Sequence, residues 1–188
     1  MINWMYFPKN KKLDNMSKQV ISVFDGVAKD IDSDTHTYKS DEVLAKVRPG
    51  LEACGFDVEK NKSKNGLISV PVLFGQNGRI EKSFDVDAWN ESEYYVIEVE
   101  AGRAVANYQF LKDFFEACTM NGVDKLCIAV RNTYNGANDF ATVCAFFEAM
   151  YASGRLTVPL SGILIIGYWL LLIISINLYK KRHFYFIK

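Results

Sequence analysis

The chain has 188 residues, 49% of them hydrophobic and 23% charged, and its formal net charge is zero. This length is sufficient for one domain with a hydrophobic core. The balanced charge argues against a protein that coats nucleic acid through a uniformly basic surface, although a local basic face around an acidic site is compatible with it.

The cysteines indicate a reducing compartment. All four lie in apolar stretches, and they form neither a CxxC pair nor a cluster with histidine. We therefore interpret them as reduced core residues, not as a disulfide framework or a zinc site. The first residues, MINWMYFPKNKK, lack the long apolar stretch of a signal peptide. Both observations predict a cytoplasmic location. The cysteines are Cys54, Cys118, Cys127 and Cys144.

Two helices are predicted before the first strand. The second begins at Asp41, is interrupted at Pro49 and ends near Gly55, because glycine suits a helix end. The first is indicated by apolar residues that recur at steps of three and four positions. These residues are Leu13, Met16, Val20, Val23 and Val27.

Strands are predicted from residue 56 onward. Residues 66–74 form a β-branched run in which Pro71 indicates an edge position or a bulge. Asn77-Gly78 is typical of a tight hairpin turn, and the strands 80–89 and 94–100 follow it. These segments predict a meander of antiparallel strands.

The C-terminal half predicts a β-α-β crossover. Residues 126–130 are continuously apolar, as in a strand buried on both faces, and 162–168 form a final strand. Two helices flank residues 126–130. The order of elements predicts an α/β (α+β) fold with a mixed central sheet. The expected core residues of the two helices are Tyr108, Leu111, Phe115 and Cys118, and then Phe140, Val143, Cys144, Phe147 and Met150.

Four carboxylates occur near the ends of the strands 80–89 and 94–100. Side chains alternate along a strand, so Glu98 and Glu100 project to one side, as do Asp85 and Asp87. If the two strands pair, these groups converge. Like charges at such a range repel, and a divalent metal is the usual reason for gathering them. Ligands that are all oxygen favour Mg²⁺ or Mn²⁺ over zinc.

This pattern resembles the PD-(D/E)xK nuclease superfamily. The matching residues are Asp87-Ala88-Trp89 and then Glu98-Val99-Glu100, with Glu100 at the position where lysine is usual. Some type II restriction enzymes carry the same ExE variant. The resemblance covers residues 39–168 and implies a restriction endonuclease-like core, preceded by a helical segment at residues 1–38.

The resemblance also implies an activity and roles for residues. The activity is Mg²⁺-dependent hydrolysis of DNA, and double-stranded DNA is the expected substrate. Mn²⁺ would be a substitute metal, and the enzyme could be a homodimer. Asp87, Glu98 and the Val99 carbonyl would bind the metal. Glu100 would orient or deprotonate the attacking water, or hold a second metal. The alternative is a catalytically inactive module of the same fold that binds nucleic acid or a partner protein.

Several further residues are candidates for the site. Asp85 could replace Asp87, and Glu52 could be a further ligand or an ordinary exposed helix residue. Arg103 opens the expected helix after the glutamates, where free N–H groups favour phosphate. Arg131 could line the same cleft or lie in a surface loop. Asn107 is the other candidate for contact with nucleic acid, and Gln109 is a possible additional residue of the catalytic site.

The C-terminal end allows two interpretations. Residues 157–179 contain no charged residue, and the run is long enough to cross a membrane. We favour a division in which 162–168 is the closing strand and 169–188 is an apolar and basic tail. The tail could be a membrane-associating helix, an oligomer contact or a stretch of altered reading frame. The remaining alternative is a membrane-anchored protein.

Overall fold

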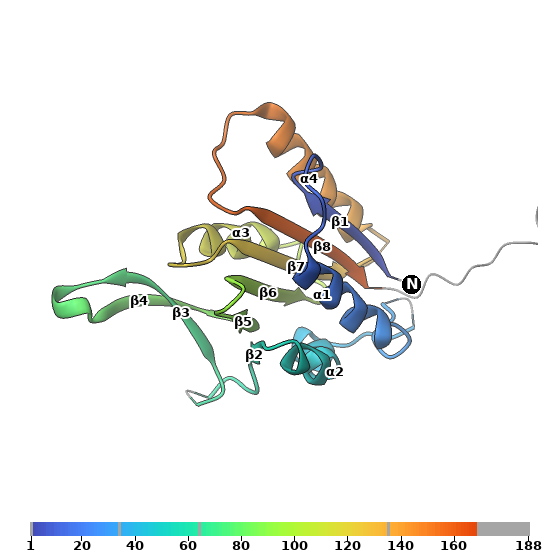
Figure 1. The fold of residues 1–188 in the computed structure, drawn as a ribbon. Helices are drawn as coiled ribbons and strands as arrows, with labels where there is room; N and C mark the ends of the chain where they lie inside the picture. Colours follow the sequence, from blue (N-terminus) through green and yellow to red (C-terminus); the bar gives the residue numbers. More distant parts are fainter. Residues whose placement is uncertain (1, 34, 64, 135, 169–188) are drawn as a thin grey trace, which may run out of the picture.

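The computed structural model describes residues 2–33, 35–63, 65–134 and 136–168. A six-stranded sheet with the order β1-β8-β7-β6-β5-β2 forms the centre, and β3 and β4 form a separate two-stranded sheet (Figure 1). The elements are β1 (Asn3–Phe7), α1 (Asn15–Gly26), α2 (Ser40–Ala53), β2 (Asp57–Val58), β3 (Ile68–Phe74), η1 (Gln76–Gly78), β4 (Ile80–Val86), β5 (Ala88–Asn90), β6 (Tyr95–Glu100), α3 (Gln109–Thr119), β7 (Lys125–Arg131), α4 (Asp139–Ser153) and β8 (Gly162–Tyr168).

The sheet is mixed, which confirms the predicted fold class. β6, β7 and β8 are parallel, and α3 and α4 make the two crossovers between them. β1, β5 and β2 are antiparallel to their neighbours. The parallel strands align in rows across the sheet, so that Glu100, Val130 and Gly167 lie side by side. Two rows earlier, Glu98 lies beside Ile128, which in turn lies beside Ile165.

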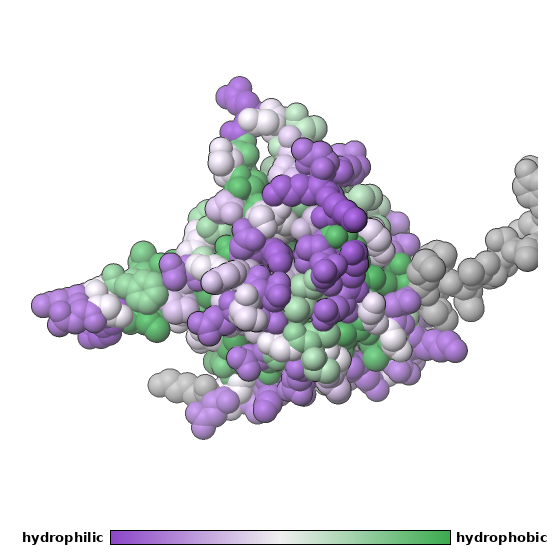
Figure 2. Space-filling model, in the orientation of Figure 1, coloured by the Kyte–Doolittle hydropathy of each residue, from purple (hydrophilic) through white to green (hydrophobic). Residues whose placement is uncertain are grey.

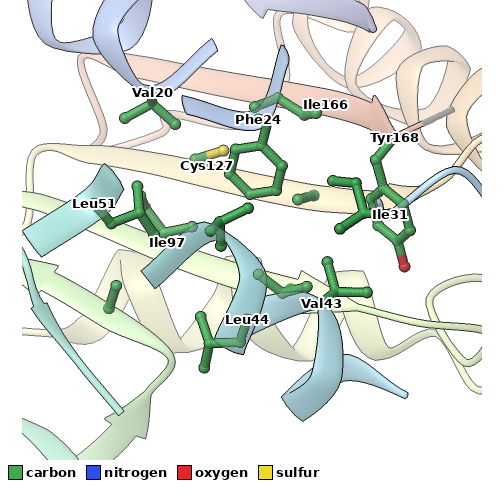
Figure 3. Packing of buried hydrophobic residues seen from close by; sticks show 14 of the residues in the cluster. Val20, Phe24, Ile31, Val43, Leu44, Leu51, Ile97, Cys127, Ile166 and Tyr168 are labelled. Carbon is green, nitrogen blue, oxygen red and sulfur yellow. The ribbon is translucent and has the colours of Figure 1, made fainter. Parts of the chain in front are cut away.

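Helices cover both faces of the sheet. On one face, apolar residues of α1 and α2 pack on the odd-numbered side chains of β6 (Figure 3). On the other face, α3 and α4 pack on the even-numbered ones, and Phe147 of α4 contacts the rings of Phe7, Phe110 and Phe114. Each fully buried side chain of this size contributes about 1.5–3 kcal/mol. The second of these cores fixes α3 against β6, where the candidate site lies.

β3 and β4 form a ribbon that projects from the body of the molecule (Figure 1). Its turn contains Asn77 and Gly78, both with positive φ, as the Asn-Gly signal predicts. The register shifts after Pro71, which confirms the predicted irregularity. The ribbon is attached near this point, because the Asn121 N–H donates to the Pro71 carbonyl at 2.8 Å.

The structure corrects two predictions in the first half of the chain. α2 continues through Pro49, because Val47 and Leu51 are buried on either side of the proline and hold the helix in place. Pro49 itself is exposed, so the lost hydrogen bond is at the solvent side. Residues 80–89 are two strands rather than one: β4 pairs with β3, and only β5 pairs with β6.

A third correction concerns the ends of the sheet. The sequence predicts a helical segment at residues 1–38, whereas residues 3–7 form β1, an edge strand beside β8. The closing strand 162–168 is confirmed as β8. The tail assigned to residues 169–188 lies outside the described residues. Within the described part of the chain, the helices are too short or too polar to cross a lipid bilayer.

Candidate functional site

The candidate site is a cavity at the carboxyl end of β6. Glu98 and Glu100 project toward the α3 side of the sheet and both line this cavity, which has a volume of about 960 Å³. The end of β4, the β4–β5 junction and α3 supply the other walls next to β6. Acidic and basic side chains dominate the lining. The acidic ones are Asp41, Glu59, Asp85, Asp87, Glu98, Glu100 and Asp113, and the basic ones are Lys39, Lys62, Arg103, Lys112 and Arg131.

Asp87 occupies the junction between β4 and β5. Its Oδ2 accepts a hydrogen bond from the Val99 N–H at 2.8 Å, and its backbone carbonyl accepts one from the Glu59 N–H at 2.8 Å. Burial raises the pKa of its carboxyl to about 6, a rise that the Val99 hydrogen bond and the Lys62 charge reduce. Asp87 is therefore fixed directly beside the strand that carries the two glutamates.

The two glutamates lie in an environment that disfavours negative charge. Burial, followed by the charges of Asp87 and Asp113, holds the pKa of Glu98 well above its usual range. Among the described residues, no group donates a hydrogen bond to the Glu98 carboxylate. Burial and the charge of Asp113 raise the pKa of Glu100 to about 8. Without a cation, these groups favour their protonated forms.

Asp113 of α3 completes the cluster, and the sequence analysis did not identify it. Its side chain is only 3% exposed, and Oδ1 accepts a hydrogen bond from Gln109 Nε2 at 3.2 Å. Oδ2 is buried and has no hydrogen-bond partner in the part of the chain that the structure describes. Burial raises the pKa of Asp113 to about 7, and the Lys112 charge reduces that rise. A buried, unpaired oxygen of this kind is costly unless a ligand contacts it.

The prediction for the buried face of α3 is wrong for two of its four residues, since only Leu111 and Cys118 pack against the core, and this explains the omission. Tyr108 and Phe115 were expected in the core, but each is 66% exposed. The buried face instead contains Phe110, Asp113 and Phe114. The signal in the sequence is the spacing of Asp113, which lies three positions after Phe110 and one before Phe114 and so falls on the same helix face.

Two lysines approach the carboxylates from elements other than β6. Lys112 lies beside Asp113 on α3, and its Nζ is 3.3 Å from Glu116 Oε2. Lys62 lies on the opposite wall, with its Nζ 2.8 Å from Glu59 Oε1. Their charges lower the pKa of Glu98 and of Asp87, respectively, against the effect of burial. The cavity therefore contains lysine although Glu100 occupies the position of the motif lysine.

Other candidates from the sequence line the cavity in different ways. Asp85 is exposed at its edge and accepts a hydrogen bond from Ser69 Oγ. Gln109 is the first residue of α3 and orients Asp113. Arg131 is buried, donates to the Tyr38 carbonyl and lies 5.0 Å from the centre of the Tyr134 ring. It is therefore already engaged with the protein.

Two positions differ from what the sequence predicts, and a third, Glu52, agrees with it. Arg103 is exposed and lines the cavity, but it precedes the start of α3 at Gln109 and so does not open that helix. Asn107 is exposed and is not among the residues that line the cavity. Glu52 is exposed in a separate hollow beside Gly55, which agrees with its interpretation as an ordinary helix residue.

The donor set fits a hard divalent cation in its chemistry. Its members are carboxylates and the Val99 carbonyl, which are oxygen donors, and the carboxylates repel one another when ionised. Across residues 2–168, gaps at 34, 64 and 135 aside, no three acidic, histidine or cysteine side chains are already arranged to hold an ion. Rotation of the glutamate side chains would therefore accompany binding.

Comparisons of the chain with protein families, with curated proteins and with solved structures found no match.

Proposed function

We propose that this cavity is the active site of a Mg²⁺-dependent, restriction-type endonuclease that hydrolyses phosphodiester bonds of double-stranded DNA. The observation that carries the proposal is the convergence of four buried or half-buried carboxylates with lysine and arginine in one cavity. These carboxylates come from the β4–β5 junction, from β6 and from α3. The PD-(D/E)xK resemblance of Asp87, Glu98 and Glu100 supports the same activity.

In this proposal Asp87, Glu98 and the Val99 carbonyl hold Mg²⁺, with Mn²⁺ as a substitute. A divalent ion bound there lowers the pKa of a water molecule and neutralises charge on the phosphate. Asp113 lines the same cavity, and its unpaired Oδ2 would be a further oxygen ligand. A bound cation would stabilise the ionised forms of the neighbouring carboxylates, because its charge offsets their mutual repulsion.

The remaining residues handle the proton and the phosphate. Glu100 lines the cavity beside the proposed metal ligands, and burial raises the pKa of its carboxyl above that of an ordinary glutamate, as suits a general base, so we assign it the proton of the attacking water. Arg103 is exposed at the cavity and can contact a phosphate oxygen. Lys112 and Lys62 add positive charge where negative charge develops in the transition state.

The second candidate is a module that binds nucleic acid or a partner protein and lacks catalysis. Glu100 in place of lysine favours it. We also propose a cytoplasmic location, because all four cysteines are free thiols. Membrane association would depend on residues outside the described part.

The test is cleavage of mixed duplex DNA by the purified full chain with Mg²⁺ and with EDTA. Wild type should cut only with the metal. Asp87→Asn and Glu98→Gln should each reduce cleavage by at least about 10²-fold, while the matched Asp85→Asn keeps it. Loss with Asp85→Asn and retention with Asp87→Asn would reverse our choice of aspartate. Binding without cleavage by wild type would establish the non-catalytic candidate.

A further inference from the structure

One edge of the projecting ribbon has no partner strand. β4 pairs with β3 on one side, and within the described residues no strand pairs with its other side. The Arg79 carbonyl accepts from the Gly75 N–H at 2.8 Å and therefore points toward β3. Backbone groups alternate along a strand, so the N–H and C=O of Ile80 point outward. Ile80 thus presents a free donor and a free acceptor to any approaching strand.

Apolar side chains lie along this open edge. Ile80 is 54% exposed and stands opposite Phe74, which is 50% exposed. Because they are opposite each other, both belong to one face of the ribbon. Figure 2 shows a hydrophobic area on the projecting ribbon, next to a hydrophilic tip. An exposed apolar edge is a template for pairing with another chain. The ribbon therefore has the features of a docking surface for a strand.

The sequence of β4 is complementary to itself about Ile80. When two copies pair antiparallel with Ile80 opposite Ile80, Arg79 of each copy lies opposite Glu81 of the other. The outward groups of the two Ile80 residues then form a mutual pair of hydrogen bonds. In the single chain Glu81 rests over Gly75, and it reaches this position by rotation of an exposed side chain.

We propose that a second copy of this chain docks here, and that the two β4 strands pair antiparallel about Ile80 to form a four-stranded sheet. This closes a two-fold interface in which each contact occurs twice. Phe74 and Ile80 of both copies then form one apolar strip. The proposal stands independently of the nuclease activity.

The charge of the ribbon favours a second copy over DNA. A two-stranded ribbon fits the major groove in size. However, Arg79 and Lys82 are balanced by Glu81 and Asp85, so the ribbon of residues 68–86 has no net charge. Binding to phosphates depends on an excess of positive charge. The balanced pattern instead matches an interface whose charges pair with each other.

Sedimentation velocity on the full chain over a range of concentrations tests the proposal. Wild type should form a dimer. Arg79→Glu and Glu81→Arg should each raise the dimer Kd by at least about tenfold, because a pair of like charges then occurs twice. The double variant Arg79→Glu/Glu81→Arg should restore wild-type dimerisation. Lys82→Glu is the matched control, since Lys82 would lie opposite the uncharged Gly78, and it should leave the Kd unchanged.

Ile80→Pro provides a second test. Proline removes an outward N–H and so leaves the β3–β4 pairing intact, and Arg79 already has the extended backbone that precedes proline. The variant should be monomeric with an unchanged circular dichroism spectrum. A monomeric wild type, or a double variant no better than the single ones, would overturn the proposal. So would association that requires added duplex DNA, which would assign the ribbon to nucleic acid instead.

Discussion

Two rows of residues run across the parallel strands from β6 to β8, and their side chains are acidic at the β6 end and apolar or absent at the β8 end. At β8, Ile165 and Gly167 are buried, and Phe140 of α4 lies so close to Gly167 that a Cβ there would be 2.7 Å from its ring. At β6, Glu98 and Glu100 occupy the same rows and line a cavity. Carboxylates therefore occur in these rows of the parallel sheet only where the helices packed on it leave a cavity.

The largest expected effect comes from moving a carboxylate to the covered end. Ile165→Glu places a charge in the row of Glu98, but with apolar neighbours and no cavity. An uncompensated buried charge costs about 3–5 kcal/mol, so we expect this loss in the free energy of unfolding, measured by urea denaturation. Ile165→Val is the matched control and should cost about 0.5–1.5 kcal/mol. Equal losses in the two variants would contradict the comparison.

A divalent ion should stabilise the folded protein through the carboxylates at the β6 end of the rows and not through the apolar β8 end. Binding only to the folded state adds RT ln(1 + [L]/Kd), or about 2.7 kcal/mol at a hundredfold excess over Kd. Mg²⁺ or Mn²⁺ should therefore raise the Tm of wild type, and raise it much less in Glu98→Ala and in Asp113→Asn. Asp85→Asn should respond as wild type does. An unchanged Tm at millimolar metal would favour a carboxylate cluster that binds no ion.

The acidic end should also make stability depend on pH. Asp87, Asp113 and Glu100 have pKa values raised to about 6, 7 and 8. Between about pH 4 and pH 8 the folded state therefore binds protons that the unfolded chain has released. Stability must fall as pH rises through this window, by up to about 1.4 kcal/mol per pH unit for each such proton. Urea denaturation in EDTA at several pH values checks the sign, and a rising curve would disprove it.

The smallest expected effect is an increase in the free energy of unfolding. Glu98→Ile gives β6 the side chain that β7 and β8 carry in the same row. It removes a buried carboxyl group and its repulsion from Asp87 and Asp113. In EDTA at about pH 8 we expect the free energy of unfolding to rise by about 1 kcal/mol, with a weaker pH dependence. Asp85→Leu, at an exposed position, should not stabilise. Destabilisation by Glu98→Ile would mean that Glu98 supports the fold.

The sequence was informative where a pattern is local. Alternation in YYVIEVE placed Glu98 and Glu100 on one face of a strand, and the structure has both lining one cavity. The same reasoning failed for α3, because several choices of apolar stripe fit a helix rich in aromatic residues. The correct choice depends on which residues meet β6 and α4, so Asp113 became visible only in the fold.

Other features could not be derived from local patterns. The break between β4 and β5 depends on β4 leaving the main sheet to pair with β3. Residues 3–7 are too short and too irregular in hydrophobicity to indicate a strand by themselves. They become one because β8 offers an edge with which to pair. Both features are decided by distant parts of the chain.

The pairing of β1 with β8 has a consequence for the time course of folding. Asn3 lies opposite Gly167, so roughly 160 residues of chain form a loop that this contact must close. During synthesis, β1 is made before β8 and cannot pair with it until β8 has also been made. Contacts of such long range slow folding and prolong the exposure of intermediates. Until β1 pairs with β8, the apolar edge of β8 is open to other chains, so a strand that comes early in the described chain protects one that comes much later.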